Sequence, residues 1–232
     1  MNFLKPAVLA VPLLCFLGFA LFGCERSIEW NQRTILHFET PYGPMQASGV
    51  IAVRFGHPTA FSRNYLIGGG GLRSQVRGEA VVADFGDGKV LIALLQNLTP
   101  ALRTAVYHQQ EDVAQSSHDR NAALRTSKAA AGHFEPIDVA RQNWPKIVTF
   151  ANLSDPTTIK LVDPNRISLV IGDGFTLTHV TVQATTDPVT RGNVAKVLPC
   201  FDSREGCVTP YQPTPYGHPL GLLLGGLGKS SF

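Results

Sequence analysis

The sequence predicts a single α+β domain built on a mainly antiparallel sheet, and three patterns carry this prediction. Apolar and polar residues alternate over residues 36–40 and again over 45–55, as expected for strands with one buried face. Two apolar runs flank an Asp-Gly turn within residues 78–95, which is typical of a β-hairpin. Small and apolar residues recur at helical spacing over residues 101–106, which indicates a helix packed on the sheet.

A turn joins the first two predicted strands. Residues 41–44 (PYGP) are a turn by composition, so the strands on either side are expected to pair. In the second strand, Gln46, Ser48 and Arg54 occupy the face opposite the apolar residues. One face of this pair should therefore be buried and the other should carry polar side chains.

The second run of the hairpin, residues 89–95 (KVLIALL), is apolar on both faces, so we expect a central strand covered on both sides. A helix that begins near Pro100, with Thr99 as its N-cap, is the expected cover for its back. The predicted buried stripe of that helix is Ala101, Leu102, Ala105 and Val106.

The second half of the chain alternates short elements with turns. Residues 109–134 are polar and rich in alanine, and we expect an exposed helical or mobile excursion. Residues 136–144 predict a short helix that ends at Pro145. Three further strands are expected, at residues 147–150, 158–162 and 175–184.

The N-terminal segment predicts export. One basic residue, Lys5, precedes an uncharged apolar run over residues 7–22, as in a signal sequence. The end of this run, residues 21–24 (LFGC), resembles the lipobox of bacterial lipoproteins, although Phe22 stands where a small residue is usual. The resemblance implies that Cys24 is acylated and becomes the first mature residue.

Two alternatives for this segment remain open, an uncleaved N-terminal transmembrane helix and a secretory signal cut at another position. Each of the three interpretations implies that the rest of the chain is exported. We therefore expect residues 1–23 as a lipoprotein-type signal, 24–32 as a tether, 33–200 as the α+β domain, and 201–232 as a disulfide loop followed by a tail rich in Pro and Gly. The expected location is the cell envelope, anchored to a membrane and facing the periplasm.

Two cysteines near the end of the domain predict a disulfide. Cys200 and Cys207 enclose a short polar loop, and a loop of this size can meet disulfide geometry in an oxidising compartment. A zinc site needs four ligands, and His218 alone does not complete one with this pair.

Several catalytic and binding motifs are missing from the sequence. It contains neither a G-x-S-x-G nor an H-E-x-x-H segment, which argues against the common serine hydrolase and zinc peptidase arrangements. The glycine run at residues 68–71 continues into a predicted strand rather than a helix, so it is interpreted as a connection rather than a phosphate-binding loop. Arg63, Arg73 and Arg77 flank that run and are interpreted as solvated. The net charge of +3 is too small and scattered to predict a nucleic-acid partner.

The acidic residues and histidines of the chain are compatible with one alternative, catalytic function. Asp84 interrupts an apolar strand, and Glu79 and Asp87 lie on the same hairpin, so a carboxylate-dependent hydrolase stays open as the alternative function. The favoured interpretation is that Asp84 caps the turn. His179 lies within a predicted strand and is interpreted as a core or sheet-surface residue rather than a metal ligand.

The chain also resembles an uncharacterised family of exported proteobacterial proteins over roughly residues 30–200. The matching segments are Glu39-Thr40-Pro41, GEAVVADFGDGKVLIALL (78–95), Val148-Thr149-Phe150 with Asp155-Pro156, LVDPN (161–165), and LTHVTVQATTDPVTRG (177–192) before VLPC (197–200). The resemblance implies one compact domain and brings no activity with it.

Taken together, these patterns predict a membrane-anchored envelope lipoprotein with a non-catalytic binding or structural role. No catalytic, cofactor-binding or metal-binding residue is predicted, and no cofactor is expected. The expected partners are the membrane, through a lipid on Cys24, and another envelope protein.

Overall fold

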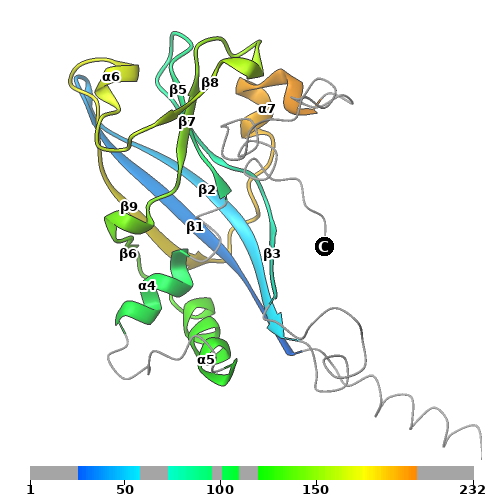
Figure 1. The fold of residues 1–232 in the computed structure, drawn as a ribbon. Helices are drawn as coiled ribbons and strands as arrows, with labels where there is room; N and C mark the ends of the chain where they lie inside the picture. The colour runs from blue at the N-terminus through cyan, green and yellow to red at the C-terminus, as the bar shows by residue number, and fades with distance from the viewer. Residues whose placement is uncertain (1–25, 58–72, 96–100, 110–119, 203–232) are drawn as a thin grey trace, which may run out of the picture.

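Two antiparallel sheets and four α-helices make up the described part of the chain, which in this computed structural model comprises residues 26–57, 73–95, 101–109 and 120–202 (Figure 1). The predicted α+β class on a mainly antiparallel sheet is thereby confirmed. The strands are β1 (Arg26–Thr40), β2 (Gly43–His57), β3 (Arg73–Arg77), β4 (Val81–Asp84), β5 (Val90–Ala93), β6 (Ile137–Asp138), β7 (Ile147–Phe150), β8 (Ile159–Val162) and β9 (Thr176–Thr185). The helices are α4 (Ala101–Gln109), α5 (Arg120–Ala131), α6 (Ser168–Ile171) and α7 (Asn193–Val197), with 3-10 turns η1 (Arg141–Asn143), η2 (Pro156–Thr158) and η3 (Pro199–Asp202).

The larger sheet has the strand order β3-β2-β1-β9-β6 and is organised around the β1–β2 hairpin. Both strands of this hairpin are 15 residues long, and their pairing runs without a break from Thr40↔Gly43 to Arg26↔His57. The prediction of a tether over residues 24–32 is therefore wrong for residues 26–32, which form the first half of β1. Trp30 on the inner face of this half is buried in the core, which explains why the segment is held in the sheet.

The smaller sheet has the order β4-β5-β7-β8. Its first two strands form the predicted hairpin, in which Asp84 pairs with Val90 across a turn where Asp87 has a positive φ of 52°. All four residues of β5 are buried, and the strand lies between β4 and β7. The prediction of a central strand covered on both sides is confirmed.

The main core fills the space between the two sheets and extends beneath α4 and α5. Every residue of the predicted helical stripe is buried there. The expected role of that helix is nevertheless wrong, because α4 packs on β6, β9 and α5 rather than on the back of β5. The back of β5 is instead covered through a second, smaller core to which Val194 of α7 and Leu198 contribute fully buried side chains.

The segment at residues 109–134 is partly helical, as expected, but its helix is not an exposed excursion. Helix α5 packs on β1, β2 and β9, and it buries Ala122, Thr126 and Ala130 at successive turns of one face. Small side chains on this face let the helix lie close to the sheet without a strong apolar stripe. The helix predicted at residues 136–144 is also wrong, since that segment forms β6 and η1.

Candidate functional site

Asp84, which interrupts an apolar run in the sequence, stabilises a turn. It is exposed at the end of β4, and its Oδ1 accepts a hydrogen bond of 2.9 Å from the backbone N–H of Gly86. This is the favoured interpretation of the sequence, in which a short acidic side chain caps the turn that follows it. The geometry gives Asp84 a local structural role.

Glu79 is buried and holds the N-terminus of α7. Only 4% of its surface is exposed, and its carboxylate accepts hydrogen bonds from the backbone N–H groups of Gly192, Asn193 and Val194 at 3.0, 2.8 and 3.4 Å. The first backbone N–H groups of a helix have no partner inside the helix, and a carboxylate satisfies them with a favourable charge. Glu79 therefore fixes the helix that covers the back of the smaller sheet.

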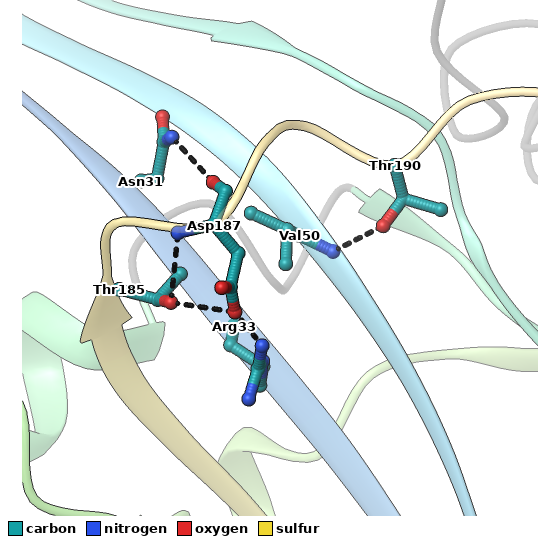
Figure 2. Close-up of polar contacts among 6 residues, drawn as sticks. All are labelled: Asn31, Arg33, Val50, Thr185, Asp187 and Thr190. Carbon is teal, nitrogen blue, oxygen red and sulfur yellow. Dashed lines mark hydrogen bonds and ion pairs between the residues drawn. The ribbon is translucent and has the colours of Figure 1, made fainter.

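Residues 185–191, which we call the strap, carry the chain from the end of β9 across β1 to β2, as Figure 2 shows. At β1, the side-chain amide of Asn31 donates to the backbone carbonyl of Asp187 at 2.8 Å, and the Asp187 carboxylate pairs with Arg33. The hydroxyl of Thr185 donates to the same carboxylate at 2.9 Å. Asp187 is thus bound to β1 through both its main chain and its side chain.

The strap reaches β2 at Val50 (Figure 2). The backbone N–H of Val50 donates to the Thr190 hydroxyl at 2.8 Å, and the backbone N–H of Thr190 donates to the Val50 carbonyl at 2.9 Å. Two residues later the chain enters α7 at the contacts with Glu79. The polar residues of the strap consequently position α7 and serve the fold.

Two histidines 142 positions apart in the sequence stack on each other on the outer face of the larger sheet. The rings of His37 and His179 lie 3.9 Å apart between centroids with 13° between their planes. The Nε2 atom of His37 lies 3.0 Å from the Thr181 hydroxyl, and its Nδ1 atom lies 3.2 Å from the Gln46 amide nitrogen. Burial and the neighbouring His179 lower the pKa of His37, while the charge of Asp138 acts in the opposite direction.

A β-bulge creates this pair. His37 pairs with His179, but Phe38 pairs with Leu177, so β9 carries one extra residue, Thr178. The extra residue brings His179 to the outer face although Leu177 points into the core. Within the described ranges no group of three His, Cys, Asp or Glu side chains is placed to hold a metal ion. The histidines form a surface pair whose ring contacts are to each other and to polar neighbours.

A cavity of about 190 Å³ lies between α4 and the segment around β6, and we call it the edge cleft. Its floor is apolar and buried, and its rim carries a carboxylate, an imidazole and three side-chain amides. The lining residues are Ala101, Ala105, His108, Gln109, Ile137, Asp138, Val139, Ala140, Gln142 and Asn143. This cleft is not predictable from local sequence patterns, because its two walls come from segments about 30 positions apart that both predict helices.

The edge cleft borders an open strand edge. Strand β6 is the outermost strand of the larger sheet in the described chain, and it pairs with β9 only. The backbone N–H of Val139 donates to the carbonyl of Val180 at 2.8 Å. Because hydrogen-bonding groups alternate sides along an antiparallel strand, the N–H and C=O of the preceding residue, Asp138, point away from β9. Asp138 is also one of the residues that line the edge cleft.

Most of the predicted modification sites lie outside the described residues. This holds for Cys24 and Cys207, and also for Arg63 and His218, so the lipid anchor and the disulfide stay predictions. Cys200 lies in η3, partly buried against the smaller core. Arg73 and Arg77 lie in β3, the strand that the sequence predicted after the glycine run. None of the helices in the described part of the chain is both long and apolar enough to cross a lipid bilayer.

Comparisons with known proteins identify no relative of this chain. The chain matches no family model, no curated protein and no solved structure. The resemblance to exported proteobacterial proteins therefore stays a prediction, and the functional argument depends on the geometry of this chain alone.

Proposed function

We propose that the protein is a membrane-anchored lipoprotein of the bacterial cell envelope, acylated at Cys24, whose folded domain binds another molecule without catalysing a reaction. The observation that carries the proposal is the start of β1 at Arg26. Only Glu25 separates the proposed acylated residue from the long hairpin around which the larger sheet is built. A lipid on Cys24 would hold one end of this hairpin close to the membrane.

The polar residues of the domain support a binding role rather than a catalytic one. Asp84 caps a turn, Glu79 caps α7, and Asp187 fastens the strap to β1. These acids are engaged in holding the fold, whereas acid catalysis requires a carboxylate within reach of a reacting group. No observation favours the carboxylate-dependent hydrolase over the binding role.

The anchor is tested by intact-mass analysis of the protein extracted from the membranes of cells that express the full chain. The expected species begins at Cys24 and carries the added mass of its acyl groups, and Cys24→Ala abolishes both features. Cys15→Ala is the matched control, because it removes a cysteine of the same apolar segment and should leave processing unchanged. A full-length chain with unmodified Cys24 in the membrane fraction would instead establish the uncleaved transmembrane helix.

The binding role is tested separately, by crosslinking the anchored protein in living cells. We expect one reproducible envelope partner that is lost when the folded domain is destabilised. A domain that remains uncrosslinked at every exposed position tried would contradict the binding role, and it would leave the anchor untouched.

A further inference from the structure

We infer that the edge cleft binds an extended peptide segment of another protein, which adds to the free edge of β6 and places one apolar side chain on the cleft floor. This inference deepens the binding role proposed above by naming the class of partner and the residues that contact it. The inference does not depend on acylation of Cys24, so the proposed peptide site and the proposed lipid anchor can fail independently.

The main chain of β6 supplies the first argument. The N–H and C=O of Asp138, a residue that lines the cleft, point away from β9 and have no backbone partner among the described residues. An open strand edge is a template for a further strand, because an extended peptide supplies one acceptor and one donor at the matching spacing. Peptide-binding domains that use strand addition obtain affinity from such main-chain bonds and selectivity from a neighbouring pocket.

The size of the cleft supplies the second argument. Drug-sized ligands and cofactors occupy pockets of about 300–1,000 Å³, and the edge cleft is smaller, at about 190 Å³. The buried part of the α4 wall is formed by Ala101 and Ala105, and the buried part of the opposite wall by Ile137 and Val139, so the floor is apolar and shaped partly by small side chains. A space of this size and character suits one aliphatic side chain of a longer molecule.

The rim supplies the third argument. Gln142 is exposed beside the cleft, and Asn143 and Gln109 add further side-chain amides, which can pair with the amide groups of a peptide on either side of the buried residue. Asp138 contributes a carboxylate at the strand edge itself. A peptide with a lysine or arginine next to its apolar residue should therefore bind more tightly than one with an acid there.

The test uses the full chain in a neutral detergent and measures fluorescence anisotropy of a labelled, capped probe peptide, Ac-Ala-Lys-Leu-Lys-Ala-amide. Ala140→Trp fills the cleft from an exposed position of its lining, and Ala151→Trp is the matched control at an exposed position outside it. We expect the dissociation constant to rise at least tenfold for Ala140→Trp and to change less than twofold for Ala151→Trp. Equal effects of the two variants would overturn the inference, as would failure of the wild-type chain to bind the probe.

Two further measurements separate strand addition from other modes of binding. Asp138→Pro removes the free-edge N–H without removing a bond to β9, and Pro is tolerated at such edge positions; we expect at least tenfold weaker binding with unchanged circular dichroism. Replacing both lysines of the probe by glutamates should weaken binding severalfold, and Asp138→Asn should reduce that difference. If neither change affects binding, the peptide does not lie along β6.

A photoreactive benzoyl-phenylalanine at position 140 identifies the occupant. Crosslinks to the probe peptide support the inference. Crosslinks to residues 203–232 of the same chain, formed in preference to the probe, would show that the cleft serves the protein's own C-terminal segment and would overturn the assignment to another protein.

Discussion

Replacing Glu79 by Gln should destabilise the protein far more than a single-atom change on the surface would. The substitution keeps the length of the side chain but turns one acceptor oxygen into an NH₂ donor that faces backbone N–H groups. Of the three bonds that Glu79 accepts, those from Gly192 and Asn193 are short, at 3.0 and 2.8 Å, and the bond from Val194 is long, at 3.4 Å. The perturbation therefore disrupts two strong charge-assisted bonds, of which Gln can retain one.

A bond to a charged group contributes about 1.5–3 kcal/mol, so Glu79→Gln should lower the free energy of unfolding by about 2–3 kcal/mol. For a chain of this size that corresponds to a fall of roughly 4–12 °C in the midpoint of thermal unfolding. Glu79→Ala removes every acceptor and should lower the free energy of unfolding by more, about 3–5 kcal/mol, because three backbone N–H donors lose their partner.

The assay is urea unfolding of the full chain in a neutral detergent, followed by circular dichroism, with hydrogen exchange as a local readout. Amide protection should fall first at residues 193–198, because Glu79 holds this segment. Asp163→Asn is the matched control, since Asp163 is an exposed turn cap that accepts a hydrogen bond from the backbone N–H of Asn165 at 2.9 Å. This substitution should lower the free energy of unfolding by less than about 1 kcal/mol. If Glu79→Gln destabilises the protein no more than this control, the assignment of Glu79 as the residue that holds α7 is wrong.

Three further predictions concern pH, backbone conformation and the disulfide. The lowered pKa of His37 means that its imidazole binds a proton more readily in the unfolded chain than in the folded one. The contribution of His37 to the free energy of unfolding is therefore fully present above about pH 6.5 and is lost as the pH falls below that value. Unfolding midpoints at pH 8 and pH 5 should differ less in His37→Gln than in the wild-type protein. Gly78 has a φ of 143°, and a Cβ there would lie 2.9 Å from a side-chain carbon of β2, whereas Gly86 has a φ of 81° and open space around it. We expect the free energy of unfolding to fall by about 2–4 kcal/mol in Gly78→Ala and by about 1 kcal/mol in Gly86→Ala. Equal losses in the two variants would show that the steric clash at Gly78 does not contribute. Alkylation of the unfolded protein before and after reduction should show that Cys200 and Cys207 become accessible only after reduction, and two free thiols in exported protein would refute the bridge.

Local sequence patterns predicted those elements whose buried faces are apolar. The stripe of α4 and the strand at residues 147–150 were predicted correctly because every buried position in them is apolar or paired within a regular ladder. The first half of β1 was missed because its inner face includes Gln32 and Thr34, which are buried despite being polar. The Oε1 atom of Gln32 accepts a hydrogen bond from the backbone N–H of Leu102, a contact across 70 positions that no local pattern contains.

The features of the candidate site depend on long-range packing and could not be predicted. Strict alternation would place His179 on the same face as Leu177, and only the extra residue of the bulge turns it outward toward His37. The edge cleft required β6, a strand of two residues whose sequence favoured a helix. The role of Asp84 was predictable because an Asx turn is local, whereas the role of Glu79 was not, because its partners lie more than 110 positions away.

The pairing of β1 with β9 has a consequence for the order in which the molecule can assemble. The first strand of the described chain acquires its second neighbour only from residues 176–185, and the smaller sheet acquires its back cover only from residues 193–198. Contacts between such distant segments form slowly, because a long loop must close before they are made. In the export from the N-terminus that we propose, the β1–β2 hairpin can form early, but the back of β5 stays uncovered until residues 193–198 have crossed the membrane. For a chain exported as we propose, the complete fold would become accessible only at the end of translocation, and the chain would stay loosely folded while it crosses the membrane.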